Sequence, residues 1–132
     1  MKQKKIVIVE DELIIAEEIK TMLLKDNLDV YGIAMSGEEC IKFVEEIHPD
    51  LVIMDVMLSG KMTGVEAAMI IHRNFGTPVI FLTAYVDEEV LEGAIECDPY
   101  GYLVKPVREK DVRTAVKMAF YMIKREESEK TI

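Results

Sequence analysis

The chain alternates short apolar runs with longer segments in which apolar residues recur every three or four positions. The runs are rich in Val, Ile and Leu and lack polar alternation, which is typical of strands buried on both faces of a sheet. The longer segments have the spacing of amphipathic helices. The predicted strands are 6–9, 30–34, 51–55, 79–83 and 102–104, and the predicted helices are 13–24, 37–47, 65–73, 87–96 and 109–127.

Each predicted strand is followed by a predicted helix. This order favours a doubly wound α/β fold, with a parallel sheet covered on both faces. The 132 residues, half of them apolar, suffice for a single domain with its own core. We expect the core to span about residues 4–124, and the charged residues 126–132 to form a frayed tail or the start of a linker to a further domain.

Two local details within the helices can also be predicted. Ser36 and Glu39 have the spacing of a capping box at the start of the second helix. The fourth helix is acidic and has one apolar side, which we expect to face the core. That side consists of Val90, Leu91, Ala94 and Ile95.

The composition narrows the classes of function. A net charge of −9 and a pI near 4.7 argue against binding to nucleic acid or to an anionic membrane. No apolar run is long enough for a signal peptide or a membrane span. Cys40 and Cys97 form no Cys-x-x-Cys pair, and His48 and His72 stand apart from them, so we expect no structural zinc site. Two reduced thiols fit a cytosolic protein.

Polar residues of distinct types stand where four of the predicted strands end. Glu10 and Asp11 follow the first strand, Asp55 ends the third, Thr83 ends the fourth and Lys105 follows the fifth. Because the carboxyl ends of parallel strands meet at one edge of the sheet, we expect these side chains to share a crevice.

Three ionised carboxylates in one crevice repel one another unless a cation lies between them. Oxygen ligands favour Mg²⁺ or another hard divalent cation such as Mn²⁺. With such an ion and Lys105 the local charge is near zero, so the crevice could accept a phosphoryl group. Asp55 could then attack phosphorus and become an aspartyl phosphate, while Thr83 could donate a hydrogen bond to a phosphoryl oxygen.

Each residue also has an ordinary structural interpretation. Asp11 could cap the helix that follows it. Thr83 could be a strand-end or capping residue, and Lys105 a surface residue, although Pro106 can be cis and orient the lysine before it. The coincidence of all four strand ends favours a functional site.

Four motifs resemble the receiver domain of two-component response regulators, and the resemblance spans about residues 4–124. The motifs are Val9-Glu10-Asp11-Glu12, Val52-Ile53-Met54-Asp55, Leu82-Thr83-Ala84 and Tyr102-Leu103-Val104-Lys105-Pro106. The resemblance implies a flavodoxin-like, three-layer fold with five parallel strands in the order 2-1-3-4-5. It also implies that Asp55 accepts a phosphoryl group from a histidine of a sensor kinase or phosphotransfer domain.

The resemblance further implies a role for each site residue. Asp11, Asp55 and the backbone carbonyl of Met57 would bind Mg²⁺ directly, and Glu10 would bind it through water. Lys105 would contact the phosphoryl group, Thr83 would move toward it, and Tyr102 would turn inward, unless Tyr102 is simply a half-exposed strand residue. The loop 57–64 is one residue longer than the commonest receiver pattern. The bulky Met57 and Tyr85 occupy positions that tune phosphoryl lifetime, and we hypothesise that they hinder an attacking water.

Two surfaces are candidates for contact with partners. Leu13 and Ile14, with the loop after Pro106, would meet the phosphodonor or else pack on neighbouring helices. The 87–125 face could serve a homodimer or a downstream protein. Extra apolar residues of the last helix either contribute to that face or thicken the core: Met118, Phe120, Tyr121 and Met122.

Three competing functions remain open on the sequence. The domain could be an interaction module that is never phosphorylated. A small phosphatase of the haloacid-dehalogenase type would need a second Asp where Met57 stands. A flavodoxin would need a phosphate-binding loop where the acidic run 10–12 would repel phosphate. The favoured interpretation is a cytoplasmic signalling domain that is not an enzyme beyond self-phosphorylation and slow self-dephosphorylation.

Overall fold

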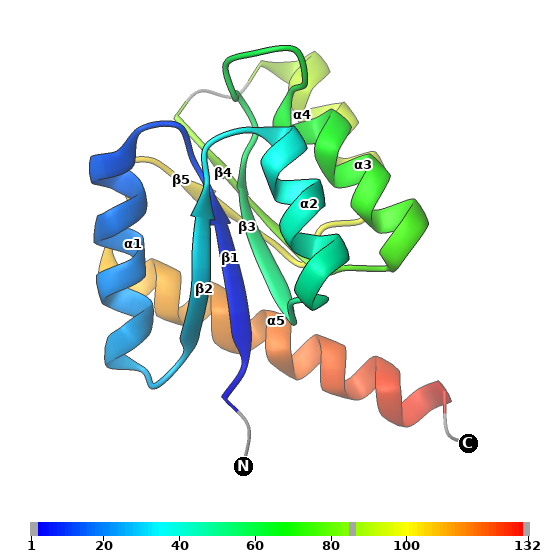
Figure 1. The fold of residues 1–132 in the computed structure, drawn as a ribbon. Coiled ribbons are helices and arrows are strands. Elements are labelled where there is room, and N and C mark those ends of the chain that lie inside the picture. The colour runs from blue at the N-terminus through cyan, green and yellow to red at the C-terminus, as the bar shows by residue number, and fades with distance from the viewer. Residues whose placement is uncertain (1–2, 85–86, 131–132) are drawn as a thin grey trace.

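A computed structural model describes residues 3–84 and 87–130, and shows a five-stranded sheet flanked by helices (Figure 1). The elements in chain order are β1 (Lys5–Val9), α1 (Leu13–Lys25), β2 (Asp29–Ala34), α2 (Gly37–Ile47), β3 (Leu51–Asp55), α3 (Gly64–Phe75), β4 (Val79–Thr83), α4 (Glu88–Glu96), β5 (Gly101–Val104) and α5 (Glu109–Lys130). The strands are parallel and ordered β2-β1-β3-β4-β5. The predicted doubly wound α/β fold and its strand order are therefore confirmed.

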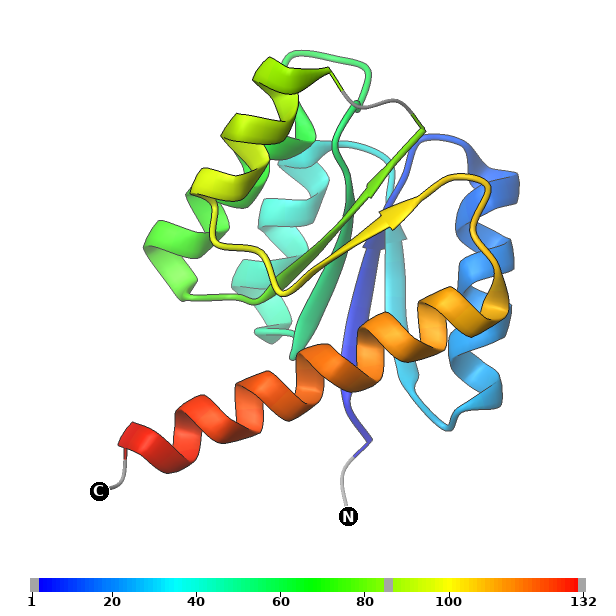
Figure 2. The same cartoon turned by 180° about the vertical axis from the view of Figure 1, so that it is seen from behind.

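The sheet separates two hydrophobic cores, because successive side chains of a strand point to opposite faces. In β1, Ile6 and Ile8 join the core beneath α1 and α5, whereas Val7 and Val9 join the core beneath α2, α3 and α4. The central strands β3 and β4 alternate in the same way. Figures 1 and 2 show the resulting three layers. This is why the strands are apolar on both faces.

The helix starts differ in one respect from the prediction. The hydroxyl of Ser36 accepts a hydrogen bond from the backbone N–H of Glu39, as predicted, at 3.1 Å. The Glu39 carboxylate, however, accepts from the N–H of Met35 and not from that of Ser36. A complete capping box occurs at α3 instead, between Thr63 and Glu66.

The last two helices depart from the prediction at their ends. In α4 only Ala94 is fully buried, while Val90 is partly buried and Ile95 is 60% exposed, because the helix contacts its neighbours along a narrow stripe. The last helix is longer than predicted, since α5 continues beyond residue 127 to Lys130 and projects past the sheet (Figure 2). An Arg125–Glu129 ion pair of 3.6 Å, one turn apart, supports this extension.

No helix within residues 3–84 and 87–130 is both long and apolar enough to cross a membrane. Cys40 and Cys97 are buried, unpaired thiols.

Gly64 closes the loop that links β3 to α3. Its N–H donates to the carbonyl oxygen of Val56 at 3.0 Å. A Cβ at position 64 would lie 1.8 Å from the carbonyl oxygen of Asp55, which is backbone and cannot rotate away. The end of β3 and the start of α3 can therefore approach this closely only with glycine at position 64.

We predict opposite effects for two glycine-to-alanine changes in helices. Gly64→Ala should lower the free energy of unfolding by about 2 kcal/mol or more, because the added methyl group overlaps the backbone of Asp55. Gly93→Ala, in α4, should raise it by up to about 1 kcal/mol, because its Cβ would meet only a Val65 methyl group at an ordinary 3.4 Å. Urea denaturation of both variants checks this, and equal stability of the two would contradict it.

Candidate functional site

Side-chain alternation brings three of the predicted site residues to the same side of the sheet edge. Each of them stands two positions after a strand residue that faces the core beneath α1 and α5. Glu10 follows Ile8 of β1 in this way, Asp55 follows Ile53 of β3, and Lys105 follows Leu103 of β5. All three therefore emerge on the side of α1 and α5.

The ammonium of Lys105 reaches across the end of β4 to both carboxylates. Its Nζ lies 2.9 Å from Oδ2 of Asp55 and 2.6 Å from Oε1 of Glu10. Asp55 is 3% exposed and Glu10 is 0% exposed. Charges this far from water require close compensation, and here one ammonium compensates two carboxylates.

Backbone N–H groups hold the other carboxylate oxygens. Met57 donates to Oδ1 of Asp55 at 3.0 Å, and Glu12 donates to Oε2 of Glu10 at 3.2 Å. These bonds orient the two acidic groups within the edge of the sheet, so their positions do not depend on Lys105 alone.

Asp11 does not cap the following helix. The N-cap of α1 is Glu12, and no side-chain hydrogen bond caps this helix. Asp11 instead accepts hydrogen bonds on Oδ2 from the N–H of Ser59, at 3.0 Å, and from the Ser59 hydroxyl. No pattern in the sequence indicates Ser59, because a contact between two loops leaves no periodic signal.

The acidic residues are suited to a divalent cation. One carboxylate oxygen from each of Glu10, Asp11 and Asp55 lies within 4.8 Å of the others. Oε1 of Glu10 is buried and, apart from its ion pair with Lys105, has no hydrogen-bond partner among the described residues. An all-oxygen donor set with a surplus of negative charge fits Mg²⁺.

The surplus negative charge of the site also changes the pKa values of its residues. Burial, and then the neighbouring Asp55, raise the pKa of Glu10 to about 7. Burial acts to lower the pKa of Lys105, but its contacts with Glu10 and Asp55 outweigh this effect and leave the pKa raised. The hydrogen bond from the Ser59 side chain lowers the pKa of Asp11. In the metal-free site, Glu10 therefore keeps its proton to a higher pH than an ordinary carboxyl does.

Thr83 lies at the same edge and is fully buried at the end of β4. The N–H of Lys105 donates to its carbonyl oxygen at 2.7 Å, which ties the lysine backbone to β4. Asp87 caps the next helix, α4, so Thr83 is not the cap of that helix.

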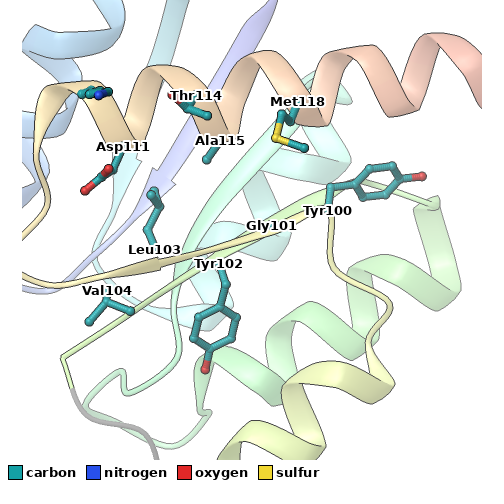
Figure 3. A pocket seen from close by; sticks show the side chains of 10 residues that line it. Tyr100, Gly101, Tyr102, Leu103, Val104, Asp111, Thr114, Ala115 and Met118 are labelled. Atoms are coloured by element: carbon teal, nitrogen blue, oxygen red, sulfur yellow. The ribbon is translucent and has the colours of Figure 1, made fainter.

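Tyr102 lies on the opposite side of β5 from Leu103 (Figure 3). Its ring packs beside that of its register partner Phe81, with centroids 6.3 Å apart, in the core of α2, α3 and α4. Its hydroxyl oxygen is buried and has no hydrogen-bond partner among the described residues, and burial raises its pKa. The ring is thus partly buried against this core.

The remaining predicted positions lie around the rim of the site. The Met57 side chain is 61% exposed, and Tyr85 lies outside the described residues. Leu13 and Ile14 are exposed at the start of α1 and belong to neither hydrophobic core. Close to them, a pocket is lined by Ile15, Pro106 and Val107, and the Lys105–Pro106 peptide bond is cis.

We predict that Glu10 makes the metal-free protein less stable as the pH rises. A carboxyl with a pKa of about 7 when folded and 4.5 when unfolded stabilises the fold below pH 4.5 and loses this contribution as the pH passes 7. Between pH 5.5 and 8, with a chelator present, the free energy of unfolding should fall by an amount on the order of 1 kcal/mol more in the wild type than in Glu10→Gln.

Urea denaturation at both pH values measures this difference. Glu45→Gln, at an exposed position of α2, is the matched control and should keep the wild-type pH dependence. The same pH dependence in Glu10→Gln and the wild type would contradict the prediction.

Comparison with known proteins identifies the family of this chain. Residues 6–117 match the profile of the response regulator receiver domain. Over 116 residues the chain is 33% identical to the transcriptional regulatory protein PdtaR of Mycobacterium tuberculosis, covering 88% of this chain and 56% of the relative. It is 32% identical to the transcriptional regulatory protein YdfI of Bacillus subtilis over 102 residues, covering 76% of this chain and 47% of that one. The chain thus spans about half the length of these curated relatives.

Solved structures give the same result. The signal receiver domain of a modulated diguanylate cyclase from Desulfovibrio desulfuricans has a TM-score of 0.89 and 32% identity, covering 95% of this chain and 99% of that one. The N-terminal domain of a response regulator/sensory box/GGDEF protein from Carboxydothermus hydrogenoformans has a TM-score of 0.85 and 36% identity, covering 93% and 98%. The profile match over most of its length, and the relatives that share its fold, show that this chain belongs to the response regulator receiver domain family.

Proposed function

We propose that Asp55 accepts a phosphoryl group from a histidine of a sensor kinase or phosphotransfer domain in a reaction that depends on Mg²⁺. The observation that carries the proposal is the buried Asp55 carboxylate, 2.9 Å from the Lys105 ammonium and beside two further acidic groups. A carboxylate in this setting can act as a nucleophile toward phosphorus once the surplus negative charge is neutralised.

The transfer itself is a displacement at phosphorus. A P–O bond forms to an Asp55 oxygen while the P–N bond to the donor imidazole breaks, and the electron pair of that bond stays on the imidazole nitrogen. Lys105 neutralises charge on the phosphoryl oxygens, and Thr83 donates a hydrogen bond to one of them. Asp11, Asp55 and the backbone carbonyl of Met57 would hold Mg²⁺ directly, and Glu10 would hold it through water. The bound ion supplies further neutralisation of oxygen charge.

Phosphorylation of Asp55 would change the packing near Thr83 and Tyr102. A hydrogen bond from Thr83 to the phosphoryl group exists only in the phosphorylated state, so it favours the arrangement of the β4–α4 loop that supplies it. Tyr102 packs beside Phe81, two residues before Thr83, and responds to the space that Thr83 leaves.

Two exposed surfaces, one near the site and one away from it, are proposed to contact partner proteins. Leu13 and Ile14, with the pocket at Pro106, form the surface proposed for the phosphodonor. The 87–125 face, with exposed Met118 and Tyr121, is proposed for a homodimer or a downstream protein. The chain 1–132 would act as one cytoplasmic receiver domain, without enzymatic activity beyond its own phosphorylation and slow dephosphorylation.

The second candidate function is an interaction module of the same fold that is never phosphorylated. A small phosphatase with an aspartyl nucleophile is weaker, because Met57 stands where its second Asp would be needed. A direct test of Asp55 separates the two leading functions.

We predict a gain of one phosphoryl group when the protein is incubated with acetyl phosphate and Mg²⁺. Intact-mass measurement should show the gain in the wild type, a strong reduction in the presence of a chelator, and complete loss in Asp55→Asn. The Asn side chain keeps the shape of Asp55 but lacks its nucleophilic charge.

Asp50→Asn is the matched control. Asp50 lies directly before the first residue of β3, at the end of the strand away from Asp55, and it accepts a hydrogen bond from the backbone N–H of Lys5. It should be phosphorylated like the wild type. A folded wild-type protein that gains nothing from acetyl phosphate or from a phosphorylated histidine donor would favour the interaction module.

We also predict that Met57→Asn shortens the lifetime of the phosphorylated form. Replacing the exposed Met57 side chain with a smaller polar one opens a path for water, and hydrolysis should be about three to ten times faster, equivalent to about 1 kcal/mol in the barrier. Met118→Asn, at a similarly exposed methionine of α5, should leave the rate unchanged. Decay of the phosphorylated mass after removal of the donor measures the rate, and an unaltered rate in Met57→Asn would contradict the hypothesis.

A further inference from the structure

The loop between β3 and α3 lies against the acidic edge of the sheet. A hydrogen bond from the N–H of Gly64 to the carbonyl of Val56 closes the base of the loop. The N–H of Val56 in turn donates to the carbonyl of Leu82 in β4 at 2.9 Å. The loop is therefore anchored to two strands. Ser59 stands in the middle of this loop and is exposed to solvent.

Ser59 makes a double contact with the loop that follows β1. Its backbone N–H and its hydroxyl both donate to Oδ2 of Asp11, with the N–H at 3.0 Å. The two residues are 48 positions apart in the sequence, so this contact is tertiary and depends on the path of the β3–α3 loop.

Both hydrogen bonds converge on one oxygen of the Asp11 carboxylate. Two donors on Oδ2 restrict the rotation of the Asp11 carboxylate. Asp11 belongs to the group of three carboxylates whose oxygens lie within 4.8 Å of one another. Hydrogen bonds to the non-coordinating atoms of metal ligands commonly set ligand orientation and metal affinity.

We propose that Ser59 is a positioning residue, which orients Asp11 for a divalent cation by holding Oδ2 through its hydroxyl and its N–H. The inference rests on the proposed function only in that it takes Asp11 as a ligand of the cation. It assigns to Ser59 a part in metal affinity, separate from any effect on phosphoryl lifetime.

The test measures the affinity for Mn²⁺ without a phosphodonor. Electron paramagnetic resonance of free Mn²⁺ gives the dissociation constant for the wild type, Ser59→Ala and Ser59→Thr. Ser59→Ala should weaken binding by about tenfold, because one of the two donors is lost. Ser59→Thr should restore most of the affinity, because the hydroxyl remains and the added methyl group can point into solvent.

Ser36→Ala is the matched control, as the same chemical change at an N-cap. It removes the hydrogen bond to Glu39 at the start of α2, so it should lower stability while leaving Mn²⁺ affinity unchanged. This separates a loss of orientation at Asp11 from a general loss of stability.

The outcomes distinguish the inference from the proposed function. If the wild type binds Mn²⁺ and Ser59→Ala binds it equally or more tightly, the positioning role is wrong, and tighter binding would mean that Ser59 competes with the cation. A loss that Ser59→Thr does not restore would also overturn the role of the hydroxyl. A folded wild type that binds no Mn²⁺ would overturn the cation site itself, and with it this inference.

Discussion

The contact of one largely enclosed ammonium with two buried carboxylates is the interaction around which the sheet edge is arranged. Lys105 neutralises one of the charges on Glu10 and Asp55, and Asp11 adds another nearby. With all groups ionised, three carboxylates and one ammonium leave two negative charges. A divalent cation removes this imbalance, and a proton on Glu10 reduces it. Cation binding and protonation therefore compete for the same surplus charge.

The sheet divides the acidic site from the aromatic residue that is proposed to respond to it. The acidic site lies on the side of the core beneath α1 and α5, since Glu10, Asp55 and Lys105 each stand two positions after a strand residue of that core. Tyr102 instead packs against the core beneath α2, α3 and α4. The main chain connects the two sides, because the N–H of Lys105 donates to the carbonyl of Thr83. This backbone hydrogen bond therefore links the end of β4 directly to the end of β5.

The sequence was sufficient for the fold and for the placement of Glu10, Asp55, Thr83 and Lys105 at one edge of the sheet. Apolar runs without alternation identify strands buried on both faces, and polar residues at the ends of parallel strands must meet at one edge. Ser59 and Gly64 could not be found in this way, because their roles depend on contacts with Asp11 and with the backbone of Asp55. The prediction for Ile95 was wrong for a related reason. Helical spacing identifies the apolar side of a helix, but it does not tell how much of that side the adjacent elements cover.

The closed base of the β3–α3 loop has a consequence for how such sites diversify. When a loop of seven residues already has its ends joined, adding one residue raises the free-energy cost of closing the loop by only about 0.1 kcal/mol. Residues 57–63 can therefore gain or lose a position with little effect on the end of β3, where the hydrogen bond between Gly64 and Val56 holds the strand in place. The groups surrounding Asp55 can therefore change with the length of this loop while the Asp55 carboxylate keeps its position at the end of β3.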